Sequence, residues 1–392
     1  MKTRKKLLLG AAALGALAAG AIVWWWLASG AEVKAFHAGA FGWHCDPNFT
    51  IVESHPRKVV VRRVGPEGEL QTLGSHPQDD ARHAAVTPGI ATFYAISTIG
   101  WGPPVECRVY DAGEELYTVP LHLLAVGPRS LAPVAVLIEG RLLTTYQDMG
   151  GPLDPPTEQE VRHVAILARE GERLTARQLV PASEQCLGLA VSGDGTTVAV
   201  ALGPSRGPQQ VVSRTLVYSA KDLKPLCMIE GLRVQAMSND GSLVVGRKGD
   251  GLAVYSNGQL LAERADRKPY YLRLSWDGAF LFLTIESQVA EVLDTKSLKT
   301  VYQARAELGM TVAACAVSSS GRLALVEQTS RGTTETVRSE LRVYGKDSSA
   351  VFTRRLGETA SSCVRALHWT RDGKVLYYLF GEEGRVVRCP VP

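Results

Sequence analysis

The sequence predicts an all-β fold, a seven-bladed β-propeller of four-stranded blades preceded by one N-terminal transmembrane helix. Two observations carry this prediction: a strand-turn-strand pattern that returns five times in the C-terminal half of the 392-residue chain, and an uncharged segment near its start. The closing glycines of the five turns are 46, 37, 43 and 52 residues apart, and their mean spacing is the period of a propeller blade. The turns are Ser192–Gly195, Ser238–Gly241, Ser275–Gly278, Ser318–Gly321 and Thr370–Gly373.

The residues of these turns explain why the pattern predicts hairpins. Asp-Gly tolerates positive φ at low steric cost, and a Ser or Thr at the start can hydrogen-bond to the turn backbone. Apolar runs such as Val234–Met237 and Phe280–Leu283 flank the turns. Continuous apolar runs are typical of strands that are covered on both faces, as in stacked blades.

Six complete blades follow one another in this interpretation. The first two cover residues 81–120 and 121–180, and a Gly/Pro-rich loop at 148–156 interrupts the second. The next four start near Cys186, Leu232, Tyr270 and Thr311. The seventh, from Ser362, has three strands, and we expect the hairpin at residues 58–73 to supply the fourth and close the ring. Six or eight blades are the alternatives.

The N-terminal segment is long enough to cross a membrane. Residues 7–31 carry no charge, and 25 helical residues at about 1.5 Å each span a bilayer core of about 30 Å. We therefore assign residues 1–6 as a basic cytoplasmic tail and 7–30 as a transmembrane signal anchor in the inner or plasma membrane. Basic residues before the segment place the rest of the chain on the extracytoplasmic, periplasmic side. The alternative is a cleaved signal peptide, because Ala28–Gly30 offers the small residues that a peptidase needs.

Residues 31–56 are predicted to be a juxtamembrane connector, and residues 57–392 the propeller. The connector contains His37, His44 and Cys45, but their spacing matches no closed metal site. The net charge of +4 equals that of Lys2, Arg4, Lys5 and Lys6 together. The rest of the chain is therefore neutral, and we expect no nucleic-acid partner.

No catalytic, cofactor-binding or metal-binding residue is predicted. Gly203–Gly207 has the spacing of a nucleophile elbow, but a strand and not a helix follows it. The aspartates of the repeated turns are expected to build hairpins and not to bind metal. Three histidines near strand ends are expected to lie on strand surfaces, and two tryptophans are expected to pack between blades, although they could line a binding face. These residues are Asp194, Asp240, Asp277, Asp372, His83, His122, His163, Trp276 and Trp369.

Seven cysteines on an extracytoplasmic domain would ordinarily suggest disulfides. Cys363 and Cys389 fall on the first and third strands of one blade, about two spacings of 4.7 Å apart, which is too far for a bridge. Most cysteines lie in apolar strand contexts, so we expect small buried hydrophobic residues. A bridge from Cys45 to a blade stays open.

Two recurring signatures resemble those of a known family. His368–Lys374 and Leu274–Gly278 look like the strand-turn-strand signature of WD-repeat-like propellers of the TolB and YVTN kinds, and Val217–Lys224 matches Val292–Lys299 at an outer turn. The resemblance covers about half of the chain. None of the turns has the proline of that family. The resemblance implies a propeller that is used mostly to bind partners.

The function expected from these observations is a membrane-anchored, non-enzymatic protein-interaction or scaffold module of an envelope complex. Its partners would be proteins on a propeller face, and the lipid bilayer through residues 7–30. One alternative is a propeller hydrolase or lactonase with a metal in the central channel. Another is a sensor that binds a small ligand, but residues 1–6 are too few for an output domain.

Overall fold

The structure is a computed structural model of the 392-residue chain. It describes residues 34–37, 49–55, 58–64, 69–77, 83–86, 93–97, 106–120, 126–127, 130–133, 135–138, 141–146, 163–170, 173–178, 184–204, 211–266, 269, 271–286, 288–329, 338–357, 364–380 and 385–392. Every element among them is a β-strand. No helix in this part of the chain is long and apolar enough to span a bilayer, and the predicted anchor at residues 7–30 lies outside it.

The N-terminal half forms three four-stranded antiparallel sheets and one short two-stranded sheet. The first sheet consists of β1 (Lys34–His37), β2 (Phe49–His55), β3 (Lys58–Val64) and β4 (Leu70–His76). The second consists of β5 (His83–Val86), β6 (Phe93–Ser97), β7 (Glu106–Asp111) and β8 (Glu114–Pro120). The two-stranded sheet pairs β9 (Val126–Gly127) with β10 (Ser130–Pro133). The third consists of β11 (Ala135–Ile138), β12 (Arg141–Tyr146), β13 (His163–Glu170) and β14 (Arg173–Gln178).

The C-terminal half forms four more four-stranded sheets and a final sheet of three strands. The fourth sheet consists of β15 (Glu184–Val191), β16 (Thr197–Pro204), β17 (Arg214–Ser219) and β18 (Pro225–Glu230). The fifth consists of β19 (Leu232–Met237), β20 (Leu243–Lys248), β21 (Gly251–Ser256) and β22 (Gln259–Arg264). The sixth consists of β23 (Tyr271–Leu274), β24 (Phe280–Glu286), β25 (Val289–Asp294) and β26 (Thr300–Arg305). The seventh consists of β27 (Met310–Val317), β28 (Leu323–Thr329), β29 (Ser339–Tyr344) and β30 (Ala350–Gly357), and the C-terminal sheet of β31 (Val364–Trp369), β32 (Val375–Phe380) and β33 (Arg385–Pro390).

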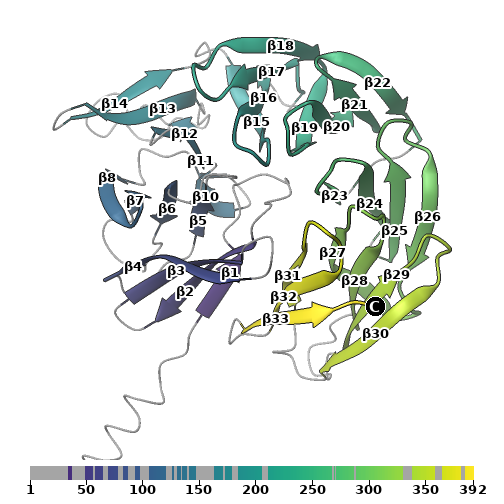
Figure 1. The fold of residues 1–392 in the computed structure, drawn as a ribbon. Helices are drawn as coiled ribbons and strands as arrows, with labels where there is room; N and C mark the ends of the chain where they lie inside the picture. Colours follow the sequence, from purple (N-terminus) through teal and green to yellow (C-terminus); the bar gives the residue numbers. More distant parts are fainter. Residues whose placement is uncertain are drawn as a thin grey trace, which may run out of the picture.

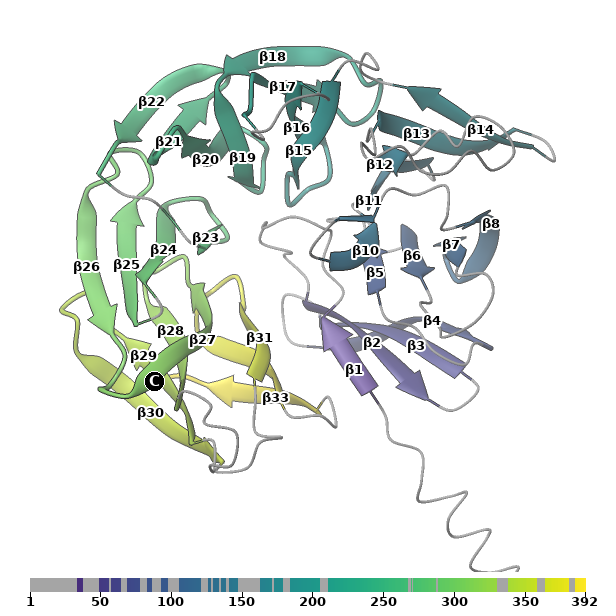
Figure 2. The ribbon, with the colours of Figure 1, turned by 180° about the vertical axis from the view of Figure 1, so that it is seen from behind.

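These sheets stand around a central axis like the blades of a propeller (Figure 1). The first strands β15, β19, β23, β27 and β31 lie toward the axis, and the fourth strands β18, β22, β26 and β30 form the rim, which is also clear from behind (Figure 2). The predicted all-β propeller with seven four-stranded blades is confirmed, although one of the seven is the sheet β1–β4 and not the predicted C-terminal blade. The three-stranded C-terminal sheet stands in the ring in addition to them.

The predicted closure of the ring is wrong. The hairpin at residues 58–73 does not pair with the C-terminal strands, because β3 and β4 form their own sheet with β1 and β2. Two strands thus lie in the stretch expected to be a connector, residues 31–56. The ring closes by face-to-face packing: Phe49 and Ile51 of the first sheet share a buried cluster with Tyr377 and Leu379 of the C-terminal sheet.

The apolar strand runs are buried on both faces, as predicted. Along β16, Val198, Val200 and Leu202 belong to a cluster within the fourth sheet. The alternating Ala199 and Ala201 belong to a different cluster, which they share with strands of the fifth sheet. Successive strand residues point to opposite faces, so each blade contributes one face to each neighbouring interface. Small alanines on one face allow the next blade to approach closely.

A β-bulge recurs near the start of the rim strands. It falls after Val61, Val109, Val217, Val254, Val292 and Val343 in the third strands, and the extra residue on the fourth strand is apolar each time. A bulge leaves one residue unpaired and bends the strand. The six extra residues are Leu73, Leu116, Leu226, Leu261, Val301 and Val351.

The described cysteines are free, and three of them are buried small residues in strands. Cys107, Cys315 and Cys389 are exposed by at most 5% of their surface. Burial raises the pKa of Cys107 and of Cys315 to about 12, so both stay protonated thiols at neutral pH. Cys45 and Cys363 lie outside the described residues, so neither predicted statement about their pairing is tested.

Candidate functional site: the mouth of the central channel

The repeated turns have one hydrogen-bonding scheme. In the sixth sheet, Ser275 Oγ donates to Asp277 Oδ1 at 2.7 Å and accepts from the Phe280 backbone N–H at 3.0 Å. Asp277 Oδ1 also accepts from the Ala279 backbone N–H at 3.1 Å. The same donors and acceptors recur in the turns that begin at Ser192, Ser238 and Thr370. The turn aspartates are therefore structural, as predicted, because their carboxylates satisfy the N–H groups of their own turns.

Neighbouring turns pack against one another around the axis. The Asp194 backbone N–H donates to the carbonyl oxygen of Asn239 in the next turn at 2.8 Å. Gly241 and Gly278 have φ of 72° and 70°, and the Cβ of Ser192 and Ser238, respectively, lies within 3.4 Å of where a glycine Cβ would be. Since an L side chain at such a position meets both strain and crowding, glycine closes each turn. Adjacent turns of the C-terminal sheets thus contact one another closely.

Four of these turns line a depression of about 360 Å³, which is bounded by Asn239, Asp240, Trp276, Asp277, Ser319 and Arg371. We call it the mouth depression. Four of its residues occupy the same position, the second, in four consecutive turns: Asn239, Trp276, Ser319 and Arg371. The first, third and fourth positions build the turn, whereas the second position varies and faces the depression.

The depression combines aromatic, cationic and acidic groups. The Arg371 guanidinium lies 5.9 Å from the centre of the half-buried Trp276 ring, within the range of a cation–π contact. Burial opposes ionisation of Asp240, but hydrogen bonds from Ser238 and Ser242 outweigh it and lower its pKa, so the carboxylate is ionised at neutral pH. A cationic side chain from one turn thus faces carboxylates from two others.

Two lining residues have unmet hydrogen-bonding capacity. Within the described part of the chain, Asn239 Oδ1 and Ser319 Oγ are buried and have no hydrogen-bond partner. A buried polar atom without a partner costs about 1–3 kcal/mol. Asn239 and Ser319 both occupy the variable second position of their turns. The free-energy cost of their unpaired atoms therefore falls at the mouth depression.

The structure separates the two tryptophans that the sequence singled out. Trp276 lines the mouth depression. Trp369 is 5% exposed, and its indole Nε1–H donates to the Ala316 carbonyl at 3.1 Å across the interface with the seventh sheet. Trp369 therefore packs between blades, as predicted, whereas Trp276 belongs to the candidate binding face.

The other sequence candidates do not converge on this site. His37, His83 and His163 lie in β1, β5 and β13. Gly203 lies at the end of β16, and the next described element, β17, is again a strand. His44, His122 and residues 205–207 lie outside the described residues. In the described part of the chain, no three His, Cys, Asp or Glu side chains are grouped to hold a metal ion.

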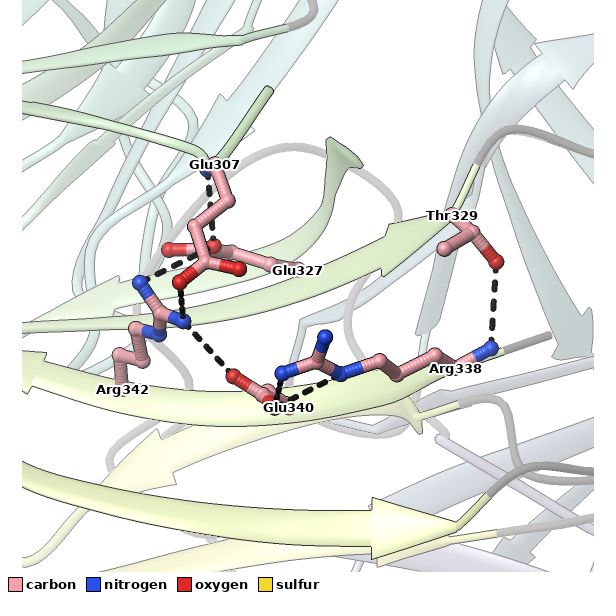
Figure 3. Close-up of polar contacts among 6 residues, drawn as sticks. All are labelled: Glu307, Glu327, Thr329, Arg338, Glu340 and Arg342. Carbon is pink, nitrogen blue, oxygen red and sulfur yellow. Dashed lines mark hydrogen bonds and ion pairs between the residues drawn. The ribbon is translucent and has the colours of Figure 1, made fainter. Parts of the chain in front are cut away.

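A second polar cluster lies at the other end of the strands of the seventh sheet (Figure 3). Arg342 bridges Glu340, at 2.8 Å, and the fully buried Glu327, at 3.8 Å, and also contacts Glu307. Arg338 Nε donates to Glu340 at 2.9 Å. Burial opposes ionisation of Glu340, but the two arginines outweigh it and lower its pKa. These opposite charges pair with one another, so the cluster connects β28, β29 and the loop before β27.

Sequence reasoning missed Asn239, Ser319 and Arg371 as site residues. Their signal was present, since each occupies the position that varies among otherwise similar turns. What the sequence did not reveal is that these positions gather in one depression, because that depends on how the blades are arranged.

Comparison with solved structures finds proteins of similar fold. The C-terminal WD40 domain of Sif2 matches with a TM-score of 0.52 and 10% identity, covering 92% of this chain and 97% of that one. The propeller domain of Cps50 (Swd1) from Myceliophteria thermophila matches at 0.44 and 11%, covering 92% and 100%. Hsv2 from Kluyveromyces lactis matches at 0.48 and 10%, covering 83% and 98%. No protein-family model matches the sequence, and the search of curated proteins found no match.

The blades and their ring define a β-propeller of four-stranded blades. The likeness to the WD40 domain of Sif2 makes this propeller WD-repeat-like in fold. At this identity the likeness concerns the fold alone.

Proposed function

We propose that this chain is a membrane-anchored, extracytoplasmic propeller that binds a protein partner at the mouth depression and acts as a non-enzymatic scaffold of an envelope complex. The observation that carries the proposal is the division of roles within the repeated turn. Ser, Asp and Gly hold the turn rigid, and the variable second residues gather in one depression. A rigid scaffold that presents varied side chains is the usual design of a binding face.

The chemistry of the depression suits a protein partner. Tryptophan and arginine are enriched among the residues that dominate interface energies, and Trp276 and Arg371 lie side by side here. Asp240 and Asp277 add carboxylates that can pair with a basic side chain of the partner. A depression of about 360 Å³ accepts a few side chains of a partner loop.

The membrane part of the proposal rests on the sequence. Residues 7–31 are uncharged and follow four basic residues, which supports an uncleaved anchor with the propeller on the periplasmic side. Leu274–Gly278 and His368–Lys374 support a relationship with propellers of the TolB and YVTN kinds.

Site-specific photo-cross-linking of the full-length chain tests the binding face. A photoreactive phenylalanine analogue is placed at Trp276 and, as a control, at the fully exposed Leu308 in the loop between β26 and β27. We expect a stoichiometric protein adduct from position 276 and none from position 308. Arg371→Glu should reduce the adduct about tenfold, as expected for loss of a central interface charge, while Lys299→Glu on an outer turn should not.

Equal adducts from both positions, or an adduct that Arg371→Glu leaves unchanged, would contradict the proposed face. The thermal unfolding temperature of each variant serves as the folding control. Protease added outside cells, with any outer membrane opened, tests the topology: digestion of the propeller is expected, and full protection would contradict the proposed orientation.

A further inference from the structure

The C-terminal sheet ends where every other blade has one more strand. Its outermost strand, β33, takes the position of the third strands β17, β21, β25 and β29, each of which pairs with a fourth strand at the rim. β33 pairs with β32 over all six of its residues. Among the strands that the structure describes, none pairs with β33 on its other side. Alternate N–H and C=O groups of β33 thus point outward, toward the place of a fourth strand.

The side chains of β33 are less covered than those of its counterparts. Third strands β21 and β25 are almost entirely buried. In β33, Val386 and Val387 are half-buried and Arg388 is exposed. Adding a fourth strand would cover these valines on both faces of the sheet, as the rim strands do in the complete blades.

The regular shape of β33 suits further pairing. Six of the rim strands carry a bulge, which bends an edge strand and makes addition of another strand unfavourable. The ladder between β32 and β33 has no register shift. An unbulged edge with a free row of backbone groups is the surface on which an extended peptide adds by β-augmentation.

Basic side chains flank this edge. Arg388 is exposed on β33 itself, and Arg354 of the neighbouring β30 is exposed and reaches to 3.9 Å from Cys389 Sγ. An added strand with carboxylate side chains would complement these charges.

We propose that the outer edge of β33 binds an extended acidic strand of a partner protein, which completes the C-terminal sheet as its fourth strand. This site lies at the rim, away from the mouth depression. The proposal is therefore independent of the proposed function, and either can be contradicted without the other.

The test uses the full-length chain in detergent and a synthetic acetylated peptide of about eight alternating glutamate and valine residues, the length of a typical strand. Hydrogen exchange read by mass spectrometry reports on residues 385–390. We expect fast exchange without peptide and protection with it. A peptide with proline at every second position keeps the charge but cannot form the ladder, so it should not protect.

Charge reversal tests the acidic character of the strand. Arg388→Glu should weaken binding of the glutamate peptide about five- to tenfold at low salt. The matching lysine-valine peptide should bind this variant better than the original chain. Lys299→Glu, a charge reversal on another blade, should change neither affinity.

Three outcomes would overturn the proposal. Slow exchange at β33 without peptide would mean that the edge is already covered. Binding without protection of residues 385–390 would place the peptide elsewhere. Protection that is insensitive to Arg388→Glu, or equal with the lysine peptide, would reject an acidic partner strand.

Discussion

Ser275 shows how one side chain fixes a turn of the propeller. Its hydroxyl donates to Asp277 and accepts from the Phe280 N–H, and the residue is 1% exposed. Both interactions are local in sequence, which is why the turn could be predicted from the pattern of residues alone. The neighbouring Trp276 takes no part in them and is free to face the mouth depression.

Ser275→Ala should lower the free energy of unfolding by about 1–3 kcal/mol, because it leaves a buried N–H without its acceptor. Ser297→Ala is the matched control: it also removes a serine hydroxyl that donates to an aspartate, Asp294, but at an exposed turn. We expect the control to cost at most about 0.5 kcal/mol. Urea unfolding curves of both variants measure the difference, and equal costs would contradict the structural role of Ser275.

The turn carboxylates make stability depend on pH in the acid range. The hydrogen bond from Thr370 lowers the pKa of Asp372, and hydrogen bonds outweigh burial to lower that of Asp240. A lowered folded-state pKa means that this stabilisation is fully present above the unfolded pKa of about 3.9 and is lost as pH falls through the folded pKa.

The unfolding temperature should therefore be insensitive to pH near neutrality and fall below about pH 4, the unfolded pKa of aspartate. Asp372→Asn should reduce the size of this fall. Thermal melts of the two proteins between neutral and acidic pH provide the measurement. An equally steep fall in the variant would mean that other groups account for it.

At the scale of the element, two glycines with similar backbone angles have different surroundings. Gly241 has φ of 72° and would place a Cβ 2.5 Å from Thr197 Oγ1 of the preceding blade. Gly249 has φ of 59°, and nothing lies within 4 Å of its would-be Cβ. The first glycine is needed for both conformation and contact between blades, and the second for conformation alone.

Gly249→Ala should cost about 1–2 kcal/mol, the strain of an L residue in the left-handed region. Gly241→Ala should cost at least about 1 kcal/mol more, because the crowding must also be relieved. Denaturant unfolding of the pair isolates the contact between turns. Equal costs would contradict the close packing of adjacent turns.

The rim bulges are elements that the sequence did not predict. Each inserts an apolar residue such as Leu226 or Leu261, which are 59% and 43% exposed. In a sequence such residues resemble ordinary strand residues. A bulge depends on which residues the neighbouring strand pairs with, and that information is not local.

At the scale of the molecule, the first and last sheets must hold the ring together without a shared strand. Phe49 is 1% exposed, lies in a buried cluster with Leu379, and stacks with His368 at a centroid distance of 5.8 Å. These contacts join residues more than 300 positions apart in the 392-residue chain. Closure is therefore a matter of side-chain packing.

Phe49→Ala should destabilise the protein by about 3–5 kcal/mol, as expected for a truncated core aromatic. Combined with Leu379→Ala, it should show a coupling energy of about 0.5–3 kcal/mol, because the two residues belong to one cluster. Additive effects of the two substitutions would contradict closure through this interface. A double-mutant cycle of unfolding free energies measures the coupling.

The sequence predicted the propeller because its signals are local and repeated. The Ser-x-Asp-Gly turns satisfy their own backbone N–H groups, and the apolar strands stand out as continuous apolar runs, so both could be recognised without knowing the neighbours. Residues 34–37 and 49–55 were not recognised as strands, since their aromatic and histidine-rich surroundings carry no such turn.

By itself, the sequence determined the all-β class, the blade period and the structural role of the turn aspartates, because short-range hydrogen bonding and alternating burial dictate them. Only the tertiary structure decided how the ring closes, that Trp276 and Arg371 meet at the mouth depression, and that no described strand pairs with the outer edge of β33. These features depend on contacts between distant segments, whose energies come from packing that no local pattern encodes.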